Sequence, residues 1–270
     1  MSDTIEVESR DRIAHIRFNR PKALNAINPE MMRAFTQALG EADSDGDVRV
    51  IVVSGNGRSF GVGYDLKHDW SQETGGGKGP LDYRSMLRRL VEFELTPWDC
   101  AKPVIAMVRG HCLAGSCEVA MMCCVTFASE NATFGEPEIR FSTSAPALIM
   151  PWIVGLKKAR ELLYTGDAID ARAALEIGMV NRVVPDDALE DATFAYARRV
   201  AAIAPEALSA TKAAINKAAE IAGMRTALDY ATEINAQLYA TKTEVYRRFA
   251  EIRDTDGLAA ALAWRESQFE

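Results

Sequence analysis

The sequence predicts an α/β fold with a helical C-terminal section. Two solid apolar runs, "VRVIVVSG" at 48–55 and "KPVIAMVRG" at 102–110, are typical of strands buried on both faces of a mainly parallel sheet. Amphipathic segments separate these strands, and from about residue 156 the chain is mostly helical. The 270 residues suit one large α/β domain, or one domain with a small helical appendage.

The individual elements follow from local patterns. Residues 5–9 and 12–18 predict two short strands around a polar turn. Residues 28–43 predict a helix, because Asn28 suits the N-cap, Pro29 suits the first helical position, and apolar residues recur at helical spacing. The glycine-rich residues 71–80 predict a loop that leads into an amphipathic helix at 81–95.

The later elements continue this alternation. The strand at 102–110 is followed by an expected helix over 114–124, and short strands follow at 125–129 and 132–136. Residues 170–185 predict a helix closed by Gly178 and then a short strand ended by Pro185. Long, Ala-rich helices are expected at 205–219 and from 226 to the end.

Composition narrows the function. The net charge is −7, so a basic nucleic-acid-binding face is not expected, and no apolar stretch is long enough to span a membrane. Neither a signal peptide nor an Arg-rich transit segment is recognisable. The odd number of cysteines, 5, favours reduced thiols and a cytoplasmic location. The three histidines lie far apart in sequence, so no metal site is expected.

Two segments could carry chemistry. Residues 54–66, "SGNGRSFGVGYDL", follow a buried strand with four glycines, which indicates either a tight loop or a close backbone approach to a ligand. Residues 114–124, "AGSCEVAMMCC", place Glu118 in an apolar run near the start of a helix, where backbone N–H groups are free. Glu118 is therefore either half of a hidden ion pair or a carboxyl with a tuned pKa.

A further pair of carboxylates stands at 132–141, "ATFGEPEIRF". Pro137 restricts the backbone just before Glu138 and holds that side chain in a defined direction. Taken alone, Glu136 and Glu138 are expected to be solvated loop residues. Taken with Glu118, Glu138 offers the second member of a general acid–base pair.

Together these stretches resemble the crotonase superfamily, the enoyl-CoA hydratase/isomerase family. The resemblance covers nearly the whole chain, in order, at "NRPKALNAIN" (19–28), "GRSFGVGYDLK" (57–67), "KPVIAMVRGHCLAGSCEVAM" (102–121), "ATFGEPEI" (132–139) and "ARELLYTGDAIDARAALEIGMVNRVV" (159–184). It implies a crotonase-like spiral of ββα turns over residues 1–200. It also implies a C-terminal helical trimerisation section over 201–270, which makes a homotrimer or homohexamer.

The resemblance also implies an acyl-CoA substrate, with neither a metal nor a redox cofactor, because coenzyme A is itself part of the substrate. The thioester oxygen would lie between the N–H groups of Val62 and Gly115, and Glu118 and Glu138 match the two catalytic glutamates of the hydratases. Coenzyme A would lie along two stretches, whose expected substrate-binding residues are Lys22, Ala23, Leu24, Gly61, Gly63, Tyr64, Asp65 and Leu66.

Some positions depart from the family pattern. Tyr64 replaces a small residue, Ser116 stands where a third glycine is common, and no glycine occurs between Gly135 and Gly155. These changes leave the acyl group open. Hydration of a 2-enoyl-CoA is the leading interpretation, and an enoyl-CoA isomerase or another crotonase-type reaction is the alternative. A crotonase-fold protein that binds acyl-CoA without turnover is a third possibility, but the presence of both glutamates argues against it.

Overall fold

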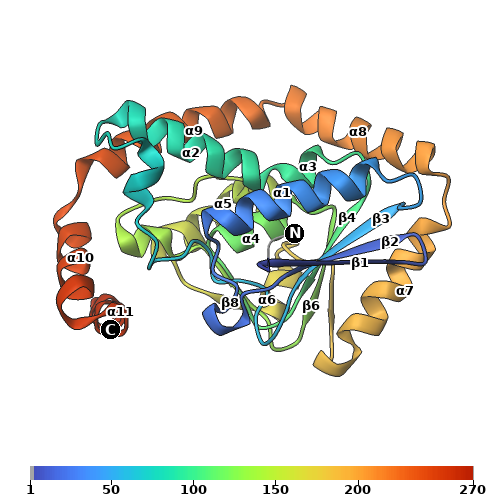
Figure 1. The fold of residues 1–270 in the computed structure, drawn as a ribbon, viewed down its shortest axis with the longest axis horizontal. Coiled ribbons are helices and arrows are strands. Elements are labelled where there is room, and N and C mark those ends of the chain that lie inside the picture. Colours follow the sequence, from blue (N-terminus) through green and yellow to red (C-terminus); the bar gives the residue numbers. More distant parts are fainter. Residues whose placement is uncertain (1–2, 270) are drawn as a thin grey trace.

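A computed structural model describes residues 3–269 and has a mixed α/β architecture around a six-stranded sheet (Figure 1). The strand order is β1-β2-β3-β4-β6-β9, with β1 and β2 antiparallel and every other pair parallel. The strands are β1 (Ile5–Arg10), β2 (Ile13–Phe18), β3 (Val50–Gly55), β4 (Val104–Val108), β6 (Val125–Ser129) and β9 (Arg182–Val184).

Helices cover both faces of this sheet, which explains its continuous apolar strands. In β3, Ile51 and Val53 join the core that includes α1 (Pro29–Ser44) and α4 (Gly115–Met122). Val50 and Val52 point the other way, towards α7 (Leu189–Ala201). Figure 1 shows α1 and α7 on opposite sides of the strands. The prediction of a mainly parallel sheet buried on both faces is confirmed.

The predicted ββα turns are present. After β4 the chain forms β5 (His111–Leu113) and then α4, and after β6 it forms β7 (Thr133–Gly135), the 3-10 helix η3 (Pro137–Phe141) and α5 (Met150–Thr165). A second, three-stranded sheet is made of β5, β7 and β8 (Ile169–Asp170), and α6 (Ala171–Glu176) follows it. The expected helix at 114–124 is present as α4, and the sequence did not predict the three-residue strand β5 that lies between β4 and α4.

The C-terminal section is helical, as predicted. It contains α8 (Pro205–Ile221), α9 (Met224–Thr241), α10 (Glu244–Asp256) and α11 (Leu258–Glu266). The expected single segment from 226 onward is divided at Lys242 and Gly257, which both adopt positive φ angles. In Figure 1, α9 runs beside α2 (Pro80–Glu94), whereas α10 and α11 form the C-terminal end of the chain, where α10 contacts η3.

The structure confirms the predicted start of α1 but differs from the prediction in the glycine-rich segment. The Asn28 side chain accepts a hydrogen bond from the Met31 N–H at 2.9 Å, and Pro29 begins the helix. The segment 71–80, expected to be a loop, begins with the 3-10 helix η2 (Trp70–Thr74). The remaining short helices are η1 (Pro21–Ala23), α3 (Thr96–Asp99) and η4 (Asp186–Ala188). Among residues 3–269, no helix is both long and apolar enough to cross a membrane.

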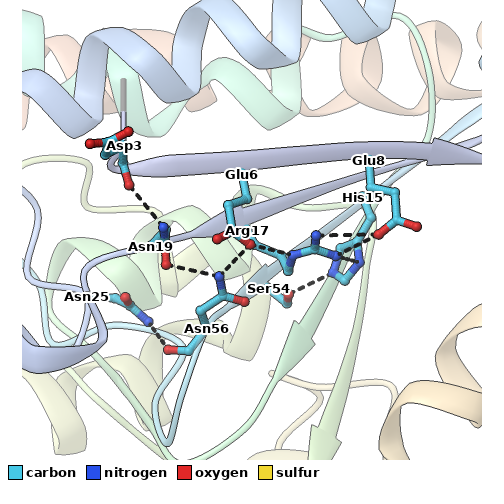
Figure 2. Close-up of polar contacts among 9 residues, drawn as sticks. All are labelled: Asp3, Glu6, Glu8, His15, Arg17, Asn19, Asn25, Ser54 and Asn56. Atoms are coloured by element: carbon cyan, nitrogen blue, oxygen red, sulfur yellow. Dashed lines mark hydrogen bonds and ion pairs between the residues drawn. The ribbon is translucent and has the colours of Figure 1, made fainter. Parts of the chain in front are cut away.

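A polar cluster lies on β1, β2 and the end of β3, and Figure 2 shows it. We name it the edge network, and its members are Glu6, Glu8, His15, Arg17, Asn19, Ser54 and Asn56. Arg17 pairs with Glu6 at 3.3 Å and with Glu8 at 3.4 Å, and the Asn56 amide donates to Glu6 at 2.8 Å. Charged side chains of this kind keep an exposed edge strand such as β1 from pairing with another chain.

Candidate active site

The predicted glycine-rich loop, residues 61–66, lies between two segments that are distant in sequence. Gly61 pairs with Cys112 of β5, and Tyr64 pairs with Ile27. The Gly63 carbonyl accepts a hydrogen bond from the Ile27 N–H at 2.8 Å. The loop therefore joins the segment after η1 to the start of the α4 region.

The two stretches expected to bind coenzyme A are linked by this pairing. Lys22 and Ala23 belong to η1, and Leu24 caps it in a left-handed conformation with φ 51°. Arg20, just before η1, forms an ion pair with Asp65 at 2.9 Å. Lys22 is exposed, whereas Gly61 and Gly63 are buried and Tyr64, Asp65 and Leu66 are partly buried.

Gly63 allows the loop to approach α4 closely. Its φ is +81°, and a Cβ at this position would lie 2.3 Å from the Cβ of Ala114 and 3.3 Å from the Gly115 nitrogen. Its N–H donates to the Ser116 hydroxyl at 3.1 Å. A side chain at this position would therefore force the loop away from the N-terminus of α4.

The N-terminus of α4 presents free backbone donors. Ala114, its N-cap, has φ 55° and ψ −139°, a conformation that is costly for a residue with a side chain. Its own N–H donates to the Gly135 carbonyl at 2.8 Å. Among residues 3–269, neither the Val62 nor the Gly115 N–H has a hydrogen-bond acceptor. Such donors at a helix N-terminus favour an anionic oxygen.

Four buried glutamates gather beside these donors, and we name them the glutamate cluster: Glu94, Glu118, Glu136 and Glu138. Glu94 ends α2, Glu118 lies in the first turn of α4, Glu136 precedes η3, and Glu138 lies within η3. Their exposed fractions are 0%, 0%, 1% and 9%. Within residues 3–269, one oxygen of Glu94 and both oxygens of the other three have no hydrogen-bond partner.

Burial controls the protonation of this cluster. It raises the pKa of Glu138 to about 7 and that of Glu94 to about 8. Burial raises the pKa of Glu118 well above its usual range, and the neighbouring carboxyls raise it further. The pKa of Glu136 is also well above its usual range, chiefly because of burial.

These findings decide the alternatives that the sequence left open. No Lys or Arg among residues 3–269 forms an ion pair with any member of the cluster, so the hidden ion pair at Glu118 is excluded within that range. The expectation that Glu136 and Glu138 are solvated is wrong, because the turn of η3 directs both side chains inward. The described residues include no group of three or more His, Cys, Asp or Glu side chains placed to hold a metal ion.

Sequence reasoning missed Glu94. The Tyr64 hydroxyl donates a hydrogen bond to its Oε1, and burial together with Glu94 keeps the pKa of Tyr64 well above its usual range, so the phenol retains its proton. The signal was present in the helix periodicity. Tyr83, Leu87, Leu90 and Glu94 follow the spacing of one buried face of α2, and all four are buried.

The segment that carries Glu138 is anchored to distant parts of the chain by Arg140. This side chain donates to the Thr165 carbonyl at 2.8 Å, pairs with Asp167, and pairs with Glu266 of α11 at 3.0 Å. Its guanidinium also lies 4.5 Å from the ring centre of Phe269. The position of η3 therefore depends on the C-terminal helices.

Known proteins share this architecture. The family described as "Enoyl-CoA hydratase/isomerase" matches residues 8–256. A probable enoyl-CoA hydratase of Mycobacterium tuberculosis is 32% identical over 270 residues, covering 99% of this chain and 98% of that protein. A crotonyl-CoA hydratase of Syntrophomonas wolfei is 32% identical over 273 residues, with 99% and 98% covered. A crystal structure of an enoyl-CoA hydratase/isomerase from Xanthobacter autotrophicus superposes with a TM-score of 0.95 at 40% identity, covering 100% of both chains.

Proposed function

The chain belongs to the enoyl-CoA hydratase/isomerase family, and from that premise we propose that it hydrates a 2-trans-enoyl-CoA to a 3-hydroxyacyl-CoA. One observation carries the proposal. Glu118 and Glu138 are two buried carboxyls that have no cation partner among the described residues, and they lie beside the free N–H groups at the start of α4. General acid–base catalysis on a thioester needs this combination of groups.

The N–H groups of Val62 and Gly115 would stabilise the thioester oxygen. Addition of water at the β-carbon moves negative charge onto this oxygen as an enolate. Fixed donors at a helix N-terminus act where that charge develops, and they need no reorganisation during the reaction. Gly63 supports this role by bringing the loop against Ala114 and Gly115.

The environments of the two glutamates support a division of labour. Glu138, with a pKa of about 7, can ionise near neutral pH, so it takes the proton from water. Burial and the neighbouring carboxyls favour the protonated form of Glu118, which gives its proton to the α-carbon. Each turnover leaves Glu138 protonated and Glu118 ionised, and return of one proton restores the starting state. No electron is transferred, so this reaction requires neither a redox cofactor nor a metal.

Substrate binding would use the two joined stretches. Lys22, Ala23 and Leu24 would contact coenzyme A on one side, and the loop from Gly61 to Leu66 would contact it on the other. The exposed Lys22 ammonium suits a phosphate group.

We further propose that residues 201–270 form the contacts of a homotrimer or homohexamer. Several large apolar side chains on α8 and α9 are exposed in the single chain, namely Ile215, Ile221, Tyr230 and Ile234. Exposed apolar faces of this kind favour a partner. Light scattering after size exclusion tests the assembly, and a monomeric mass would contradict it.

The five free thiols suit the reducing cytoplasm.

The test of the reaction is an assay with crotonyl-CoA and longer 2-enoyl-CoAs, following loss of the conjugated thioester absorbance. We expect turnover in the wild type and collapse of turnover in Glu118→Gln and Glu138→Gln. Glu130→Gln is the matched control, because this glutamate is exposed and lies between the two in sequence. Deuterium uptake from solvent without net hydration would instead indicate an enoyl-CoA isomerase. Binding of coenzyme A with no turnover at all would contradict both reactions.

A further inference from the structure

We infer that Glu94 is a positioning residue of this active site. The Tyr64 hydroxyl binds Glu94, so negative charge settles on Glu94 rather than on Glu118. Glu118 therefore keeps the proton that it transfers. The inference rests on the proposed hydration for its effect on rate. It goes beyond the two glutamates that the family resemblance identified, because it adds a third carboxyl and a hydrogen-bond donor.

The geometry places Glu94 at the first turn of α4. A Cβ on Gly115 would lie 3.1 Å from Glu94 Oε1 and 2.6 Å from Cε2 of Tyr64, so both side chains cover the residue that begins the helix. Glu118 is three residues further along the same helix. The charge of Glu94 is the largest single charge effect on Glu118, which also indicates that the two carboxyls are neighbours.

The surroundings of Glu118 contain acids and phenols. The carboxyls that raise its pKa are Glu94 of α2, Glu136 just before η3 and Glu138 within η3. Two phenols, Tyr64 and Tyr239 of α9, also interact with it. Both phenols have raised pKa values because they are buried, and they remain neutral. Protons, rather than ion pairs, must therefore balance the charge of these carboxyls within the described residues.

Tyr64 distinguishes Glu94 from Glu118. Two neighbouring buried carboxyls do not both ionise readily, so the first negative charge settles on the one whose charged form is better stabilised. Glu94 accepts a hydrogen bond from Tyr64, whereas both oxygens of Glu118 lack a partner among residues 3–269. The helix dipoles act in the opposite direction, since Glu94 ends α2 and Glu118 begins α4. A hydrogen bond to a carboxylate outweighs a helix dipole.

The consequence is a wider pH range in which Glu118 can act as an acid. Because the hydrogen bond from Tyr64 stabilises its charged form, Glu94 ionises before Glu118 as the pH rises, and its charge then opposes ionisation of Glu118. In Glu94→Gln this opposition is absent. We therefore expect the alkaline limb of kcat to move to lower pH by about one unit or more, with a smaller change in KM.

The experiment compares pH profiles of kcat and KM for the wild type, Glu94→Gln and Glu92→Gln. Glu92 is exposed on the same helix, so its variant is the matched control and should keep the wild-type profile. Tyr64→Phe should shift the limb in the same direction by a smaller amount, because the charge preference for Glu94 is weakened but the carboxyl remains. A Glu94→Gln profile that coincides with the wild-type profile, in a folded variant, would overturn the inference.

Infrared spectroscopy of the protein without substrate tests the same pair independently of turnover. We expect a band of a protonated buried carboxyl that disappears near pH 8 in the wild type and is absent in Glu94→Gln. The band of Glu118 should disappear at lower pH in this variant than in the wild type. If these bands appear but no enoyl-CoA is hydrated, the proposed function fails and the inference about the pair stands. If hydration is observed and the Glu118 band does not move, the inference fails alone.

Discussion

The edge network and the glutamate cluster use the same side chain in opposite ways. In the edge network, Glu6 and Glu8 are exposed and are bound by Arg17, and Glu6 also accepts a hydrogen bond from Asn56 (Figure 2). The hydrogen bond from Asn56 is the main reason that the pKa of Glu6 is lowered. In the glutamate cluster, burial dominates and raises every pKa.

The difference shows that a carboxyl's function follows from its partners and its burial. At the sheet edge, strong hydrogen-bond donors and solvent keep the carboxylate charged, so it can only attract positive groups or repel negative ones. In the cluster, the absence of cations and of most donors favours the protonated, uncharged form of the carboxyls. Only the second environment provides groups that can both give and accept a proton near pH 7.

The largest expected effect separates the two regions by activity. If the proposed hydration is correct, Glu118→Gln and Glu138→Gln should each lower kcat by about 10²- to 10⁴-fold, because each removes one proton-transfer group. Glu6→Gln makes the same chemical change in the edge network and should leave kcat at the wild-type value. Steady-state kinetics with crotonyl-CoA measures all three, and equal losses in the two regions would refute the distinction.

The second expected effect concerns stability as a function of pH. The folded pKa of Glu138, about 7, lies above its ordinary value of 4.5, so the folded state binds more protons than the unfolded chain between these values. The contribution of Glu138 to the free energy of unfolding is complete below pH 4.5 and is lost as the pH rises through about 7. The loss is on the order of 3 kcal/mol. Urea unfolding from pH 4 to 8 should show this decline, and Glu138→Gln should make the decline smaller, because the raised pKa values of the other three glutamates remain. A stability that rises over this range would contradict the burial of a neutral carboxyl.

The third effect is an acid limb in the rate. If Glu138 takes the proton from water, kcat/KM should fall about tenfold per pH unit below its pKa, since the base is then protonated. The midpoint should lie near 7. Profiles at constant ionic strength check this, and a midpoint near the ordinary value of 4.5 would remove Glu138 from the role of base.

The smallest effect is expected in the edge network itself. Arg17→Ala breaks two exposed ion pairs and should lower the free energy of unfolding by about 0.2–1 kcal/mol at low salt, and by less at 1 M NaCl. Thermal or urea unfolding at two salt concentrations provides the measurement. A salt-insensitive loss of several kcal/mol would mean that the network is a major part of the core.

Most of the fold could be predicted from the sequence because its signals are local. The cap at Asn28 and the apolar run of β3 depend on neighbouring residues alone. The short strand β5 could not be predicted in this way, because three residues carry too little periodicity and its partner is β7, distant in sequence. The break at Lys242 also lacked a signal, since lysine seldom adopts a positive φ.

The candidate site was only partly predictable. Glu118 stood out because it interrupts an apolar run, and Glu138 because it followed a proline and matched a family motif. The burial of Glu136 and the pairing of Tyr64 with Glu94 depend on how α2, α4 and η3 come together. No local pattern specifies that contact, although the helix periodicity places Glu94 on the buried face of α2.

The anchoring of η3 by Arg140 has a consequence for folding during synthesis on the ribosome. Arg140 and its partner Glu266 are 126 residues apart in the chain. At a synthesis rate of about 5–20 residues per second, many seconds separate the appearance of the two. Through that interval the segment that carries Glu138 lacks its C-terminal contacts. The segment with Glu138 is therefore among the last parts of the molecule to reach its final form, after the sheet strands that support it have been made.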